Sequence, residues 1–255
     1  DKYYKGKGYT EDDSRASAVM EAIERYSAER YSGQVTYCSY EEIIKNGAAV
    51  NPDDLHARVT PYYRAGMAVD WVEGFDIIGN RNTFVPLSMV VMPYTSRIET
   101  FCSSSSGLGA GNTIEEALLH SMCEIIEHDS NAMSNLFNPN KCTITFTRTQ
   151  DQSSAEIRES LPRDPTPDLM FPLIDIKSLP KQPATIAKRL IGSGLILFAR
   201  NTTTDIGIPS VYCTLVKKYP EERHIIYDGM GAHPDAEIAI LRALCEAAQS
   251  YSTYE

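Results

Sequence analysis

The chain has 255 residues, of which 42% are hydrophobic, and carries a net charge of −10 at pH 7. This length and apolar content are enough to bury a substantial core in one large domain or two small ones. Lys and Arg are scattered through an acidic chain, which argues against sequence-independent binding of nucleic acid. No apolar run reaches the ~18 residues of a membrane helix and no signal peptide opens the chain, so we expect a cytoplasmic protein without membrane contact.

Apolar periodicity and turn residues predict the elements of the first half. Residues 14–31 repeat apolar side chains at helical spacing, and a second, short helix is expected to stop at Gly47. Two runs rich in Val, Ile, Phe and Trp have the composition of strands. The predicted elements are a helix over 14–31, a short helix over 41–46, strands over 67–78 and 83–92 joined by a turn at 79–82, and a Ser/Gly loop over 103–111.

The second half begins with the most strongly marked helix, over 113–133. Thr113 and Glu116 form a T-x-x-E capping box at its start. A further helix is expected over 234–251, with Pro234 near its first turn. The remaining predicted elements are a helical segment over 186–191 and strands over 143–147, 195–200, 210–216 and 224–227. This mixture predicts an α+β fold, with mostly antiparallel sheet and helices packed on one side.

The two ends of the sequence bear on its domain organisation. The chain opens on a loop close to its first motif and stops near the expected end of its last helix. We therefore expect one domain over residues 1–255 whose natural termini are incomplete. Six cysteines occur without a C-x-x-C pair, so buried thiols are expected rather than a zinc site or a disulfide framework.

Three of the predicted helices share one polar pattern. A central Glu has a polar residue four positions before it and Glu or Gln three positions after it, and these positions share one face of an α-helix. The three stripes are Ser17, Glu21 and Glu24; Glu116, His120, Glu124 and Glu127; and Asp235, Arg242, Glu246 and Gln249. Apolar residues are expected on the opposite side, and in the second helix these are Leu118, Met122, Ile125 and Ile126.

An amphipathic surface helix is the ordinary explanation of such a stripe. Two features favour a binding site instead. The pairs Glu21 with Glu24 and Glu124 with Glu127 place like charges side by side, and the stripes lack the mixed Lys/Glu alternation of a solvated face. Converging carboxylates require a cation, and hard oxygen ligands without Cys suit Mg²⁺.

The Ser/Gly loop over 103–111 leads through Asn112 directly into the second striped helix. Its backbone N–H groups and the helix N-terminus are suited to hold a phosphate, although no Walker motif is present. A flexible linker is the alternative interpretation. Lys7, between Gly6 and Gly8, offers an ammonium group for a phosphate, with a simple turn as its alternative.

Four motifs, in order along the whole chain, resemble those of the YcaO family. They are Gly6-Lys7-Gly8 followed by Ser17, Glu21, Glu24 and Arg25; Leu108–Asn112 followed by Glu115, Glu116, Glu124 and Glu127; Asn201–Pro209; and Glu237, Arg242, Glu246 and Gln249. Two positions depart from the family pattern. His128 stands where the family usually has Arg, and Gly109 stands about where it often has Ser.

The resemblance implies an enzyme that uses ATP and Mg²⁺ to activate a peptide backbone amide by O-phosphorylation, giving an azoline, a thioamide or an amidine. It places the nucleotide or Mg²⁺ at Ser17, Glu21, Glu24, Asn112, Glu116, Glu124, Glu127, Glu246 and Gln249, with Lys7, Arg25 and Arg242 as further phosphate contacts. Within this set it implies Glu21, Glu24, Glu116, Glu124, Glu127 and Glu246 as the metal ligands. No side chain is assigned as a nucleophile, because the attacking atom comes from outside the enzyme or from the peptide.

A compact acidic chain without a Pro-rich tail or a peptide-clamp domain resembles the archaeal members that form a thioamide from sulfide. This implies a glycine of methyl-coenzyme M reductase as the target, a sulfide source, a TfuA-like partner and a homodimer. Alternatives are an azoline- or amidine-forming cyclodehydratase, a member acting in ribosomal β-methylthiolation, and a non-catalytic interaction module. A di-iron protein using Glu116, His120, Glu124 and Glu127 is disfavoured by the strand content and the ligand spacing.

Overall fold

The computed structural model describes residues 4–55, 63–95, 97, 100–101, 104–137, 170–219 and 224–254. They belong to two compact units. The first comprises Asp1–Glu21 and Gly109–Glu255, and the second comprises Ala22–Leu108. Helix α1 (Glu11–Ala28) contributes to both units, because the division falls after Glu21.

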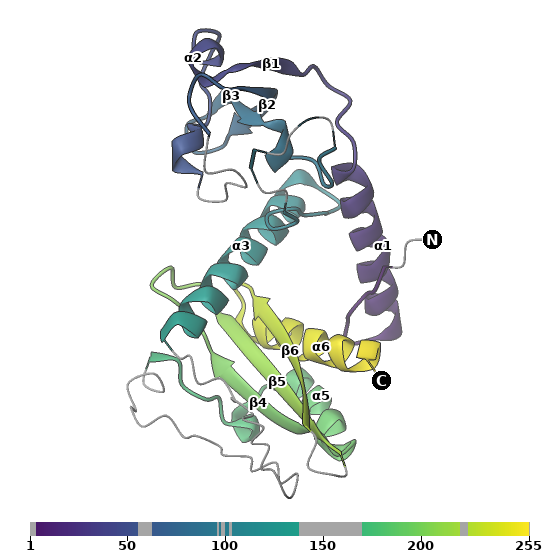
Figure 1. The fold of residues 1–255 in the computed structure, drawn as a ribbon. Helices are drawn as coiled ribbons and strands as arrows, with labels where there is room; N and C mark the ends of the chain where they lie inside the picture. The colour runs from purple at the N-terminus through teal and green to yellow at the C-terminus, as the bar shows by residue number, and fades with distance from the viewer. Residues whose placement is uncertain are drawn as a thin grey trace, which may run out of the picture. The chain divides into compact units, whose positions relative to one another are not determined.

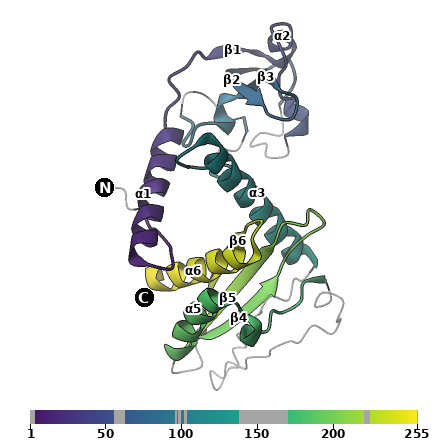
Figure 2. The same cartoon turned by 180° about the vertical axis from the view of Figure 1, so that it is seen from behind.

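The first unit is built on an antiparallel sheet in the order β4-β5-β6. Its strands are β4 (Ile196–Asn201), β5 (Ser210–Lys218) and β6 (His224–Ala232). Helices α5 (Lys181–Gly192) and α6 (Ala236–Tyr254) cover the same face of this sheet (Figures 1 and 2). Helix α3 (Ile114–Phe137) contacts β5 and β6. The core lies between the sheet and α5 and α6, and Cys213, Leu215, Ala243 and Leu244 are fully buried there.

Two glycines let α6 lie unusually close to β6. A Cβ added to Gly229 would lie 2.1 Å from the backbone nitrogen of Ala247, and one added to Gly231 would lie 2.2 Å from the carbonyl oxygen of Ala239. Ala239, Ala243 and Ala247 supply the matching small face of the helix, and none of them is exposed. This packing brings the polar face of α6 to the edge of β6.

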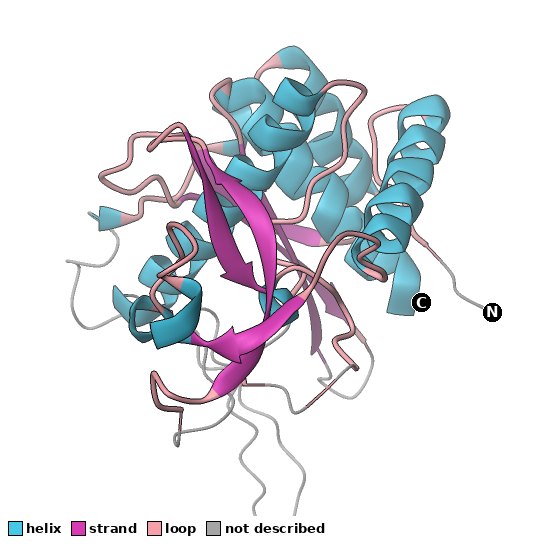
Figure 3. Ribbon diagram, turned by 90° about the horizontal axis from the view of Figure 1, so that it is seen from above, coloured by secondary structure: helices cyan, strands magenta, loops and turns pink. Residues whose placement is uncertain are grey.

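The second unit contains another antiparallel sheet, in the order β1-β2-β3. Its elements are β1 (Thr36–Ser39), α2 (Tyr40–Ile43), the short 3₁₀ helix η1 (Pro52–Asp54), β2 (Ala68–Asp76), β3 (Arg81–Pro86) and the 3₁₀ helix η2 (Leu87–Met89). Trp71 and Phe101 are fully buried in its main core cluster, together with Ile43. Helices and antiparallel strands both contribute to the protein (Figure 3), which confirms the predicted α+β class.

Most predicted elements are present, and the exceptions have structural causes. The strand predicted over 83–92 ends at Pro86, where the chain enters η2. The strand predicted to end at residue 227 continues to Ala232, because glycines that look like a turn in the sequence serve the close packing on α6. The strand predicted over 143–147 lies outside the described residues.

Helix α6 also begins later than predicted. Asp235 is its N-terminal cap, since its carboxylate accepts hydrogen bonds from the backbone N–H groups of Glu237 and Ile238 at 2.8 and 3.4 Å. The sequence placed Asp235 on the same stripe as Arg242 and Glu246, and this placement is wrong, because the side chain is turned back to the start of the helix.

Two further expectations concern the thiols and the membrane. Among the described residues Cys123 and Cys213 are buried free thiols, as expected, whereas the free thiols of Cys38 and Cys245 are only partly buried. Burial raises the pKa of the Cys213 thiol far above its usual range. None of the described helices combines the length and the apolar character that crossing a membrane requires.

Candidate nucleotide and cation site

The N-terminal segment folds back onto the first turns of α1. A Cβ at Gly6 would lie 1.7 Å from the carbonyl oxygen of Ser14, and one at Gly8 would lie 2.4 Å from the Cβ of Asp13, so both positions require glycine. Between them the backbone N–H of Lys7 donates a hydrogen bond to the Ser17 hydroxyl at 3.3 Å. The Gly6-Lys7-Gly8 motif is therefore a packed segment that joins two predicted site residues.

The loop before α3 also packs closely, in this case against α3 itself. A Cβ at Gly109 would lie 2.2 Å from the Ser121 hydroxyl oxygen, so no larger residue fits there without rearrangement. The Glu116 carboxylate accepts hydrogen bonds from the backbone and side-chain nitrogens of Asn112, at 2.8 and 3.0 Å. The His120 ring makes a hydrogen bond to the backbone of Ala110. Asn112 and Glu116, both predicted site residues, thus lie together, and the Gly109–Asn112 part of the loop is fixed to α3.

The capping box predicted at the start of α3 is half formed. The Thr113 hydroxyl accepts the backbone N–H of Glu116 at 3.3 Å, as expected. The Glu116 side chain does not complete the box, because it bonds Asn112 instead. The Glu116 carboxylate therefore binds Asn112, another predicted site residue, instead of capping the helix.

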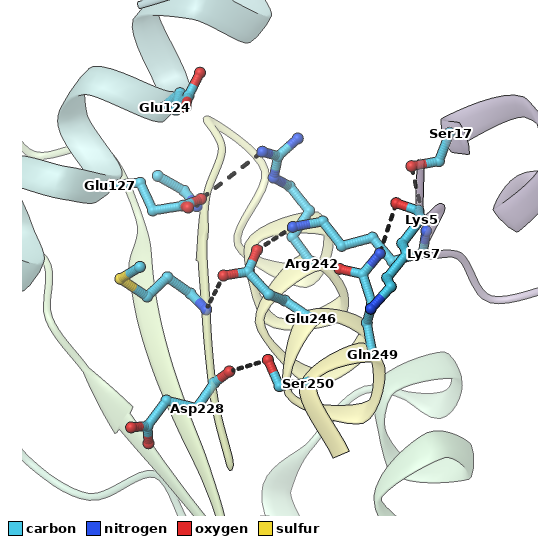
Figure 4. A network of polar contacts seen from close by, with 12 residues as sticks. Lys5, Lys7, Ser17, Glu124, Glu127, Asp228, Arg242, Glu246, Gln249 and Ser250 are labelled. Carbon is cyan, nitrogen blue, oxygen red and sulfur yellow. Dashed lines mark hydrogen bonds and ion pairs between the residues drawn. The ribbon is translucent and has the colours of Figure 1, made fainter. Parts of the chain in front are cut away.

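Four charged side chains form the centre of the site, and all four belong to the first unit (Figure 4). Lys7 forms an ion pair and hydrogen bond with Glu246. Arg242 lies with its Nη2 atom 3.7 Å from the Glu127 carboxylate. Sequence positions more than a hundred residues apart are thereby joined into one network. We call Lys7, Glu127, Arg242 and Glu246 the charged quartet.

The two carboxylates of the charged quartet also bind the backbone of β6. Glu127 accepts the N–H of Ala232 at 3.1 Å, and Glu246 accepts the N–H of Met230 at 3.3 Å (Figure 4). Because β6 is the last strand of its sheet among the described residues, these N–H groups have no described strand to pair with. The carboxylates are thus positioned rigidly by the sheet edge, a role that the sequence patterns did not reveal.

The burial of Glu127 overturns one expectation. The sequence placed Glu127 on the polar stripe and Met122 and Ile125 on the opposite side of the helix, which was expected to face the core. In the structure Glu127 is only 7% exposed, whereas Met122 and Ile125 are each 52% exposed. The buried stripe of α3 also includes Ser130, whose hydroxyl donates to Ser210 at 3.2 Å. A backbone N–H and a hydroxyl group of the sheet thus contact polar side chains on this face.

The surroundings shift two titrating groups. Burial raises the pKa of Glu127, and the nearby charge of Glu246 raises it further, against the opposing effects of Arg242 and Lys7. Burial also lowers the pKa of His120, and the Arg242 and Lys7 cations lower it further. Both effects favour the neutral form of the His120 ring.

The raised pKa of Glu127 predicts a pH-dependent stability in metal-free protein. At pH values just above the ordinary pKa of 4.5, Glu127 stays protonated in the folded state but loses its proton in the unfolded chain. The folded state therefore binds more protons than the unfolded chain in this pH range. The free energy of unfolding should therefore fall as the pH rises from about 4.5 through the raised pKa. Glu127→Gln removes the titrating group, so this part of the slope should disappear in urea unfolding measured across that range. If the unfolding free energy had the same dependence on pH in the variant and the wild type, this would contradict the raised pKa of Glu127.

The remaining predicted residues occupy supporting positions. The Gln249 side chain donates a hydrogen bond to the Lys5 carbonyl at 2.7 Å, so it anchors the N-terminal segment. Glu124 lies 3.6 Å from His128, the residue that replaces the usual family Arg. Glu21 lies on α1 one turn after Ser17, still within the first unit. Glu24 and Arg25 belong to the second unit, and their assignment to the site stays a prediction.

The donor set fits a nucleotide with Mg²⁺. Within the described ranges no three His, Cys, Asp or Glu side chains converge closely enough to hold a metal ion as they stand, and Lys7 and Arg242 neutralise two of the carboxylates instead. The available donors are nevertheless the hard oxygens that Mg²⁺ prefers. The buried Nε of Arg242 has no hydrogen-bond partner among the described residues, so a donor remains for an anionic oxygen.

Comparison with known proteins indicates the class to which this protein belongs. The family model described as YcaO cyclodehydratase, ATP- and Mg²⁺-binding, matches residues 5–255. A Rhizobium leguminosarum bv. trifolii protein described as uncharacterized, in the tfuA 3′ region, is 31% identical over 98% of this chain and 55% of its own length. An uncharacterized Methanothermobacter thermautotrophicus protein is 27% identical over 98% of this chain and 57% of its own length. The chain thus spans about half the length of these curated relatives.

Solved structures share the fold. A heterocyclase in complex with substrate and cofactor has a TM-score of 0.73 at 23% identity, covering 96% of this chain and 32% of that one. The YcaO protein from Methanopyrus kandleri bound with AMPPCP and Mg²⁺ has a TM-score of 0.62 at 23% identity, covering 98% of this chain and 55% of that one. The fold thus defines an α+β protein, and the matching family model is described as ATP- and Mg²⁺-binding. The chain belongs to the YcaO family, whose ATP- and Mg²⁺-binding description agrees with the predicted cofactors.

Proposed function

We propose that this protein activates a peptide backbone amide by ATP-dependent O-phosphorylation and that sulfide then converts the amide into a thioamide. The charged quartet is the observation that carries the proposal. It provides two cations for phosphate oxygens and two carboxylates for Mg²⁺ in one partly buried network. Such fixed charges are the main contribution that proteins make to phosphoryl transfer. The match over residues 5–255 supports treating the whole chain as one YcaO domain.

The proposed reaction balances without a protein nucleophile. Hydrosulfide adds to the amide carbon, and the resulting oxyanion takes the γ-phosphoryl group of ATP, which releases ADP. Loss of inorganic phosphate, together with the proton of the added hydrosulfide, then carries the former amide oxygen away and leaves a C=S double bond. Lys7 and Arg242 bind phosphate oxygens, while Glu127 and Glu246 hold the cation in place through their anchorage on β6. Bound Mg²⁺ would neutralise charge on the transferring phosphoryl group.

The proposed substrate is a glycine-containing segment of methyl-coenzyme M reductase, with a TfuA-like protein as partner. The relative described by its place in a tfuA region supports the partner. The resemblance to thioamide-forming members of the family supports the substrate. The second candidate is cyclodehydration of a peptide to an azoline or amidine, which the family description and the heterocyclase fold neighbour favour.

Mass spectrometry of a treated peptide distinguishes the two reactions. We expect the protein with ATP, Mg²⁺, sulfide and a glycine-containing reductase peptide to exchange one oxygen for sulfur, with ADP released. Controls omit ATP or sulfide, and a parallel reaction adds the TfuA-like partner. Loss of one water from a peptide carrying a suitable nucleophile would instead identify a cyclodehydratase. No ADP release and no mass change, with the partner present, would contradict both candidates.

We also propose a homodimer, which rests on the resemblance to the family. Light scattering at micromolar concentration should give twice the mass of the chain. A monomeric mass under these conditions would contradict the assembly without affecting the assignment of the site.

A further inference from the structure

Each carboxylate of the charged quartet already has a cation as its partner. Lys7 is 26% exposed and Glu246 is 22% exposed, whereas Arg242 and Glu127 are 24% and 7% exposed. At this degree of burial the ion pairs are only weakly screened by salt, and removing one partner leaves a costly uncompensated charge. The described structure is therefore a charge-balanced state of the site.

The same four groups have different partners in the proposed function. There the carboxylates face Mg²⁺, and the cations face phosphate oxygens. A divalent cation placed at Glu246 would repel the Lys7 ammonium that lies on this carboxylate, so the ammonium has to leave. Its long flexible stem allows this movement, while the hydrogen bond from Gln249 to the Lys5 carbonyl keeps the segment itself in place.

We propose that Lys7 and Arg242 are exchangeable counter-ions, which hold Glu246 and Glu127 until a divalent cation takes the carboxylates and nucleotide phosphates take the two cations. The inference rests on the site assigned under the proposed function. Either ligand alone leaves charges of one sign uncompensated in a partly buried site, whereas both together restore the balance. Divalent cation and nucleotide thus bind with positive coupling, and this coupling is reciprocal.

Removing the Lys7 charge should therefore free a carboxylate for metal in the absence of nucleotide. We expect Lys7→Met to bind Mn²⁺ about fivefold or more tightly than the wild type does, in nucleotide-free titrations that follow free Mn²⁺ by its magnetic resonance signal. Lys7→Gln, which retains a hydrogen-bond donor for Glu246, should shift the affinity in the same direction. Far-UV circular dichroism confirms that each variant is folded.

Lys5→Met is the matched control. Lys5 lies two residues away, is exposed, and donates to the Thr253 hydroxyl at 3.1 Å rather than to a site carboxylate. The substitution changes the net charge by the same amount, so it should leave the Mn²⁺ affinity unchanged. The inference is overturned if both Lys7 variants bind Mn²⁺ no more tightly than the wild type, or if Lys5→Met has the same effect. Because the readout is metal binding, it is independent of whether a thioamide forms.

Discussion

Replacing Glu127 with Gln is expected to lower ATP turnover by about a hundredfold or more while the protein stays folded. The Gln side chain still offers an oxygen to the Ala232 N–H, which Glu127 binds at 3.1 Å, so the attachment of α3 to β6 is preserved. The substitution removes only the negative charge, which the cation requires. ADP release at saturating ATP and Mg²⁺ measures the loss, and the melting temperature shows that the fold is retained.

Glu115→Gln supplies the control for this experiment. It makes the same chemical change on the same helix, at an exposed position in the first turn of α3. We expect its turnover to match the wild type. Wild-type turnover in Glu127→Gln as well would remove the carboxylate from the catalytic assignment, whereas unfolding of that variant would show that its charge is needed for structure.

A single methyl group at Gly229 is expected to destabilise the first unit by about 3 kcal/mol, or about 6–12 °C in Tm. The added Cβ would lie 2.1 Å from the Ala247 nitrogen and 2.3 Å from the Ala243 oxygen. Both are backbone atoms of α6, so no side chain can rotate away and the helix itself has to move. Because Glu246 belongs to this helix, Gly229→Ala should also weaken nucleotide binding at temperatures where the protein is folded.

Gly192→Ala tests the opposite case. A Cβ at this position, in the last turn of α5, meets no atom within 4 Å. The substitution should be neutral or stabilise the protein by about 0.4–1 kcal/mol, because Ala restricts the unfolded chain. If Gly229→Ala melted at the same temperature as Gly192→Ala, this result would contradict the close packing of β6 on α6.

Local patterns were sufficient to predict the helices and most strands. Helical periodicity and caps depend on residues a few positions apart, so α1, α3 and α6 were found to within a few residues. The three carboxylate stripes and the Gly/Ser loop were recognised for the same reason. The family resemblance also depends on residue order, and the match over residues 5–255 confirms it.

Predictions that needed long-range information failed. The strand β6 was cut short at residue 227, because a glycine that admits a helix backbone is indistinguishable in sequence from one that makes a turn. One local prediction also failed: Asp235 was assigned to a stripe although its side chain caps α6, because helical spacing does not distinguish a cap from the first turn. Periodicity also identified the polar face of α3 correctly but placed the core on the opposite side of the helix, since an amphipathic pattern does not say which face a partner will cover.

The sequence by itself determined which residue types are available for chemistry: carboxylates in three helices, a lysine between two glycines, and an arginine one turn before Glu246. Only the tertiary structure decided their pairing. Lys7 meets Glu246 across 239 positions of sequence, and Glu127 meets the N–H of Ala232 across 105. Such pairings depend on how an edge strand and two helices pack, and the free energy of a buried charge depends on every group around it rather than on its neighbours in the chain.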